Sequence, residues 1–259
     1  MNLTVVTSMS LTMCLIGCRP RESTNASPVV VVDVPSRAEK KPRVEITVIA
    51  TSEETTARTN DGTDPLASAR AGWQRPTACN AAACESLVLS TGGVEADGGE
   101  ALAQSMQGLG YAASIFGRST LSRAGIPALG ARSDPPLVVE RAGIKLEVIG
   151  LTERGADASG DALSSLRERV LALRAHGADS AILLTDLCVP ALADLLHRGA
   201  RDLAFLALAI GRTCHTKDWE HHIDSATLIA AGPGFPQYAK ATLTFDRNTA
   251  ALLRADTPP

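Results

Sequence analysis

Few side chains in this sequence stand where their types and spacing suit chemistry. The clearest candidates follow the apolar run Ala112–Phe116, which ends at Gly117 and leads into Arg118, Ser119 and Thr120. A strand that stops at a glycine exposes the next side chains at its carboxyl end, where open α/β sheets place their ligands. Ser119 has no neighbouring base and lies in no nucleophile elbow, so the pattern favours a helix N-cap over a catalytic serine.

A second group of reactive side chains lies between Cys214 and His222, in the sequence CHTKDWEHH. One cysteine, three histidines and two acidic residues fall within these nine positions. Their spacing matches no standard zinc motif, in which paired ligands are about two to five residues apart. The sequence therefore predicts a solvated loop here and not a metal centre.

Short apolar stretches that alternate with helical patterns would position these residues. The predicted strands are Glu45–Ile49, Ser86–Ser90, Ala112–Phe116, Ala181–Thr185 and Leu203–Ala209. The predicted helices span residues 98–108, 163–176 and 190–198; Gly177 and Gly199 follow the last two as C-terminal signals. Strands that alternate with helices indicate an α/β fold.

The composition of the chain limits the classes of function that it can have. The chain has 259 residues, enough for one domain with a sizeable core, and only 3% of them are aromatic. The net charge is −3 and no basic block is present. Nucleic acid is therefore not an expected partner, because its binding needs a positive surface and usually aromatic stacking platforms.

Several segments follow one another in an order and spacing typical of one family. They are VEITVIAT (44–51), LVLSTGG (87–93), GLGYAASIFGRSTL (108–121), VVERAGIKLEVIGL (138–151), LRERVLALRAHGADSAILLTDL (166–187), LAIGRTCH (208–215) and residues 228–245. Together they resemble the N-terminal domain of calcineurin-like metallophosphoesterases of the bacterial 5'-nucleotidase type. The resemblance implies an α/β fold with two β-sheets sandwiched between helices, in a domain that spans residues 44–250.

The same resemblance implies that the two-metal centre of the family is altered. Gly93 stands where the family has a bridging Asp, Arg118 where it has a ligand Asn, and Ser119 where a His acts as the acid. The bridging carboxylate holds two metal ions against their mutual repulsion, so its loss at Gly93 matters most. We therefore expect no dinuclear site, no catalytic residue and no cofactor.

A reduced site is the alternative that the resemblance leaves open. Glu53, Asp186 and His215 stand at other ligand positions of the family. Three ligands and an open position are the usual complement of a catalytic zinc, so these residues are candidates to hold one divalent metal. The family's nucleotidases also carry a C-terminal domain that stacks the nucleobase. This sequence stops at Pro259, so we expect no such domain.

The amino terminus has the pattern of an export signal. Residues 3–17 are mostly apolar, too few to span a bilayer, and Gly17 precedes Cys18. This resembles a bacterial lipobox, although Met1 and Asn2 supply no positive charge. We expect a signal peptide at 1–17, lipidation of Cys18, a tether at 18–43 and a short tail at 251–259. Arg19 is not the Asp that often retains lipoproteins at the inner membrane, which favours the outer membrane.

Four cysteines remain after such processing: Cys79, Cys84, Cys188 and Cys214. An even set in an oxidising compartment suggests disulfides, with three connectivities open, whereas free buried cysteines are the alternative. Cys79 and Cys84 flank a four-residue loop and could close locally. The resemblance places the strand ends at Cys188 and Cys214 near one another, so we expect their Cα atoms within about 7 Å.

Three functions fit these observations. The first is a lipid-anchored envelope protein that keeps the fold without catalysis and binds an envelope protein or another ligand. The second is an active metal-dependent phosphoesterase with a reduced, 5'-nucleotidase-like site. The third is a solute-binding lipoprotein with a different α/β fold. The residues at Gly93 and Arg118 favour the first.

Overall fold

The computed structural model describes residues 42–53, 67, 84–92, 99–115, 118–130, 134–152, 162–214, 221–234 and 237–257. The predicted signal peptide and all but the last two residues of the predicted tether lie outside this part of the chain. So do Cys18, Cys79, Gly93 and His215. Residues 40–259 group into one unit by their contacts.

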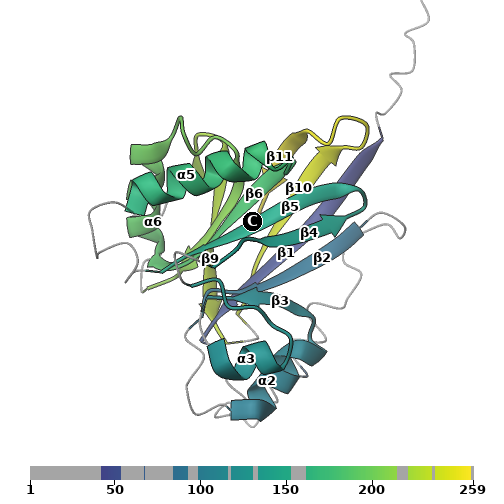
Figure 1. Cartoon of the computed structure of the whole chain (residues 1–259), viewed down its shortest axis with the longest axis vertical. Coiled ribbons are helices and arrows are strands. Elements are labelled where there is room, and N and C mark those ends of the chain that lie inside the picture. Colours follow the sequence, from purple (N-terminus) through teal and green to yellow (C-terminus); the bar gives the residue numbers. More distant parts are fainter. Residues whose placement is uncertain are drawn as a thin grey trace, which may run out of the picture. The chain divides into compact units, whose positions relative to one another are not determined.

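The described strands form one mixed sheet, drawn in Figure 1. Its order is β11-β10-β1-β9-β7-β6-β5-β4, while β2 and β3 extend from β1, and β8 pairs with β9. The strands are β1 (Arg43–Ser52), β2 (Cys84–Ser90), β3 (Tyr111–Ser114), β4 (Leu137–Arg141), β5 (Ile144–Leu151), β6 (Ser180–Cys188), β7 (Leu206–Arg212), β8 (His222–Ile223), β9 (Ala226–Pro233), β10 (Ala239–Asp246) and β11 (Leu252–Asp256).

The helices agree with the sequence pattern. They are α2 (Gly99–Gly108), α3 (Arg118–Arg123), α5 (Ala162–Ala175) and α6 (Val189–Gly199), so the three predicted helices are each within one residue of the observed ends. Gly177 has φ +76°, the left-handed conformation in which glycine ends helices. Pro190 lies in the first turn of α6, where the missing N–H costs no helical hydrogen bond.

The main core lies between two halves of the sheet. Val44, Ile46 and Val48 of β1 belong to the same apolar cluster as Leu146 of β5, whereas Ile49 packs on the opposite face of β1. Successive side chains alternate across a strand, so β1 buries both of its faces. Burial of each such aliphatic side chain contributes roughly 1.5–3 kcal/mol, so this cluster stabilises the contact between the two halves.

The two halves are one continuous sheet, whereas the sequence predicted two separate sheets. One edge of β1 pairs antiparallel with β10 as far as Ala50, and the next residues, Thr51 and Ser52, pair in parallel with Gly232 and Pro233 of β9. A side chain at Gly232 would overlap the backbone of Gln237, so the glycine permits the close approach of the residues that precede β10. The switch of neighbours along β1 joins the halves at its carboxyl end.

Helices cover the outer faces of both halves (Figure 1). Leu166 and Val170 of α5 and Leu192 of α6 pack in one cluster with residues of β5, β6 and β7. Leu102 and Met106 of α2 pack with β1 and β2 in another. In the described residues no helix is long and apolar enough to cross a membrane.

The sheet continues beyond the predicted domain end. Residues 252–256, which the sequence analysis assigned to the tail 251–259, form β11 and pair antiparallel with β10. The charged pair Arg254 and Asp256 obscures the apolar alternation of this strand, and only its pairing reveals it. The folded domain therefore extends past residue 250.

Packing at Gly150 gives a test of this architecture. A Cβ there would overlap the carbonyl oxygen of Leu129, a backbone atom that cannot rotate away. We expect Gly150→Ala to lower the free energy of unfolding by about 1–3 kcal/mol, the usual cost of overpacking. Urea denaturation beside the exposed change Ser122→Ala measures it. Equal stability of the two variants would contradict this packing.

Candidate functional site

The polar side chains of interest gather where parallel strands end. β2 and β9 run parallel to β1, β7 runs parallel to β9, and β6 runs parallel to β7. Their carboxyl ends therefore lie along one edge, which we call the carboxyl edge. Residues that immediately follow these strands are brought together there, as is usual for ligand sites in α/β sheets.

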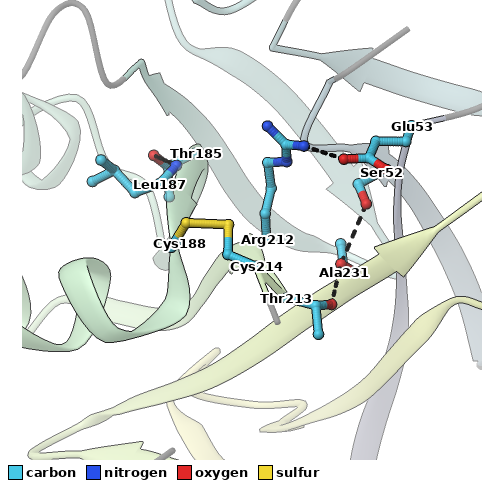
Figure 2. Close-up of a disulfide and its surroundings, with 9 residues drawn as sticks. All are labelled: Ser52, Glu53, Thr185, Leu187, Cys188, Arg212, Thr213, Cys214 and Ala231. Carbon is cyan, nitrogen blue, oxygen red and sulfur yellow. Dashed lines mark hydrogen bonds and ion pairs between the residues drawn. A yellow bond between two sulfur atoms is a disulfide. The ribbon is translucent and has the colours of Figure 1, made fainter. Parts of the chain in front are cut away.

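An ion pair crosses the carboxyl edge from β1 to β7. A guanidinium nitrogen of Arg212, Nη2, donates to Oε1 of Glu53, and Figure 2 shows the two side chains pointing toward one another. Both side chains reach solvent, with 30% of Arg212 and 48% of Glu53 exposed. A candidate metal ligand of the sequence analysis is therefore engaged by a cation of the chain itself.

The backbone at Glu53 is strained. Its φ is +51°, in the left-handed region that non-glycine residues seldom adopt. The N–H of Glu53 donates to the carbonyl of Gly92 at 2.8 Å, which holds the residue after β1 against the end of β2. Such conformations cost of the order of 1 kcal/mol or more and gather at functional sites.

Two hydroxyl groups fasten the same edge to β9. Ser52 Oγ donates to the carbonyl oxygens of Ala231, at 3.3 Å, and Gly232, at 2.9 Å. Thr213 Oγ1, which follows β7, donates to the carbonyl oxygen of Ala231 at 2.8 Å. The carbonyl of Ala231 thus links the residues on either side of the Glu53–Arg212 pair (Figure 2).

A disulfide joins the ends of β6 and β7. Cys188 and Cys214 are bonded, and their Cα atoms lie 5.4 Å apart, within the limit set for this pair from the sequence. Cys188 is also the partner of Arg212 in the register between β6 and β7. Cys214 has φ +36°, so a second strained non-glycine residue stands at this edge. The disulfide therefore ties the residue that pairs with Arg212 to the residue two positions after it (Figure 2).

Two of the three candidate metal ligands lie within the described residues. Glu53 is paired with Arg212, and Asp186 is buried near the end of β6 with 8% exposed. His215 lies outside the described residues. Among those that the structure describes, no group of three or more His, Cys, Asp or Glu side chains is placed to hold a metal ion.

Arg212 is the site residue that sequence reasoning missed. It lies within the segment LAIGRTCH, between Ile210 and Thr213, and the family resemblance points only to the histidine positions of that segment. A charged residue directly after a buried apolar strand is a signal that could have identified it. Arg118, the arginine that the sequence did single out, begins α3 after β3.

One other guanidinium is held within the domain. Arg169 of α5 donates from Nη1 to the carbonyl of Gly150 at 2.6 Å, which fastens this helix to β5. Burial lowers the pKa of Arg169 below its usual value, and the nearby carboxylate of Asp134 opposes that shift. Its donors serve the helix–strand contact, so we assign Arg169 a structural role.

Comparison with solved structures identifies similar folds. A 5'-nucleotidase precursor from Thermus thermophilus matches with a TM-score of 0.58 and 17% identity, over 82% of this chain and 53% of that one. The calcineurin-like phosphoesterase YfkN from Bacillus subtilis matches with a TM-score of 0.58 and 13% identity, over 84% of this chain and 90% of that one. An NAD nucleotidase from Haemophilus influenzae matches with a TM-score of 0.52 and 14% identity, over 84% of this chain and 55% of that one.

The chain spans about half the length of the 5'-nucleotidase precursor and of the NAD nucleotidase. No family model and no curated protein matches it. At these identities the likeness concerns the fold alone. The third function, a solute-binding lipoprotein, assumed a different α/β fold, and that is not the fold observed.

Loss of the disulfide should destabilise the carboxyl edge. The two cysteines are 26 residues apart, so the chain-entropy relation gives a stabilisation of about 3–4 kcal/mol. We expect Cys188→Ala/Cys214→Ala to unfold at correspondingly lower urea concentration than the oxidised protein. Reductant should shift the parent protein toward the double variant, and a double variant as stable as the oxidised parent would contradict the bridge.

Proposed function

Since this chain has the fold of calcineurin-like phosphoesterases and 5'-nucleotidases, we propose that it is a catalytically degenerate form of that fold. In this proposal it is a lipoprotein of the bacterial envelope that acts by binding a protein or another envelope ligand. The Glu53–Arg212 ion pair is the observation that carries the proposal.

The charge of Arg212 argues against a metal at this place. A divalent cation close to a guanidinium is repelled, and Glu53 cannot serve both cations without losing one of its interactions. The disulfide and the hydroxyl contacts with Ala231 already hold the strand ends together. The edge therefore has structural ties of its own and needs no metal to organise it.

The sequence supports the same proposal. Gly93 offers no side chain to bridge two metals, and Ser119 offers no acid with a suitable pKa for the leaving group. A two-metal phosphoesterase depends on both contributions. The active alternative would instead hold one divalent metal with Glu53, Asp186 and His215.

Catalysis provides the direct test. We expect the purified protein to show no hydrolysis of phosphomonoesters or phosphodiesters with added manganese or zinc. Loss of the metal clamp and of the general acid together removes many orders of magnitude in rate. Metal-dependent turnover that disappears in His215→Ala would contradict the proposal and establish the active alternative.

Membrane attachment through Cys18 is a separate part of the proposal. Several acyl chains anchor a protein stably, whereas one chain binds reversibly. We expect the protein to partition into detergent, to incorporate labelled fatty acid and to fractionate with the outer membrane, and Cys18→Ser to do none of these. Mature protein that retains Met1 and stays in the aqueous phase would refute the anchor.

A further inference from the structure

The guanidinium at the carboxyl edge uses only part of its hydrogen-bonding capacity. Arg212 donates from Nη2 to Glu53, and no other described residue accepts from its Nε or Nη1. Its side chain is partly exposed, so the remaining donors are open to a ligand. A guanidinium offers five N–H donors in a planar fork that fits two oxygens of one anion.

Glu53 is a partner that a ligand can replace. Nearly half of its side chain is exposed, and ion pairs between exposed groups contribute little because water and salt screen them. Its backbone is held in the left-handed region, which a non-glycine residue does not favour. Rotation of the glutamate side chain alone would release Arg212.

The base of Arg212, by contrast, is fixed. The residue pairs with Cys188 in the sheet, the next residue is fastened to the carbonyl of Ala231, and the one after it is in the disulfide. Little backbone freedom is then lost when a ligand binds, which favours affinity. Arg212 therefore combines a rigid backbone with an exposed guanidinium, as is typical of residues that recognise a ligand.

We propose that Arg212 binds the phosphate group of a small soluble ligand directly, without a metal, in exchange for Glu53. The ligand must displace a carboxylate that is already in place. A phosphate group carries up to about two negative charges at neutral pH, so it competes better than a carboxylate with one. This inference rests on the proposed function, because it assigns a ligand class to the site that has lost catalysis.

Titration of inorganic phosphate into the Cys18→Ser chain, with chelator present, tests the assignment by calorimetry. We expect saturable binding that is weakened at least about tenfold by Arg212→Gln, since a charge-assisted contact is lost. Arg212→Lys should give intermediate affinity, because it keeps the charge but not the fork. Arg254→Gln is the matched control. Arg254 is exposed and paired with Asp256 at 2.8 Å on β11, so its replacement should not change the affinity for phosphate.

The variant Glu53→Gln tests the proposed exchange of Glu53 for phosphate most directly. Removal of the competing carboxylate should tighten phosphate binding about two- to fivefold, the range expected for an exposed ion pair. Unchanged or weaker binding in Glu53→Gln would overturn the exchange. Binding that is insensitive to both Arg212 variants, or that needs added manganese, would overturn the role of Arg212.

Vesicles separate a free phosphate from one carried by a lipid. With phosphatidylcholine vesicles that contain phosphatidic acid, we expect no binding that depends on Arg212. Binding to these vesicles without binding to inorganic phosphate would overturn the proposal that the ligand is soluble. If the protein neither hydrolyses phosphoesters nor binds phosphate, the role of Arg212 is contradicted and the proposed function is not. Metal-dependent turnover would instead end the proposed function.

Discussion

The change of neighbours along β1 is the constraint on which the rest of this structure depends. Its edge pairs with β10 as far as Ala50 and with β9 from Thr51 onward. A strand can make this switch only where its two neighbours diverge, so the halves of the sheet separate on one side of this point and meet on the other. The apolar faces of both halves then enclose one core cluster, and their polar ends converge at the carboxyl edge.

Interactions of several kinds hold that edge. The hydroxyls of Ser52 and Thr213 share the carbonyl of Ala231, while the disulfide joins the ends of β6 and β7. Covalent and neutral hydrogen-bonded ties do not depend on ionic strength in the way that the Glu53–Arg212 pair does. The edge thus combines a framework that salt does not weaken with one partly exposed ion pair that salt screens.

Electrostatics distinguishes this edge from a metal centre. A metal site gathers carboxylates and imidazoles around a cation that binds from solution, whereas here the cation is a side chain of β7 and accompanies the fold. A guanidinium is always charged and cannot be removed by a chelator. An anion is therefore the class of ligand that we propose for Arg212, and the reaction chemistry that a bound metal would supply is not part of that proposal.

Local patterns in the sequence predicted the helices α2, α5 and α6 and several of the strands. The spacing of Leu166, Val170 and Leu173, closed by Gly177, is sufficient to predict α5, because burial of one apolar stripe is a local requirement of a helix. The order of the motifs also led to an α/β fold like that of the phosphoesterase structures, but not to the single continuous sheet that this chain has. Strand β11 escaped notice because an edge strand with exposed charges has no clear alternation.

Tertiary structure alone decided which side chains meet. Glu53 and Arg212 are 159 positions apart, and nothing in the residues around either one indicates the other. The contact arises from the β1–β9 and β9–β7 pairings, which are long-range hydrogen-bonded registers. The sequence by itself determined most of the helices and central strands and the family resemblance, because these follow from local periodicity and motif order. Only the register between distant strands decided that the carboxyl edge would hold an arginine paired with a candidate metal ligand.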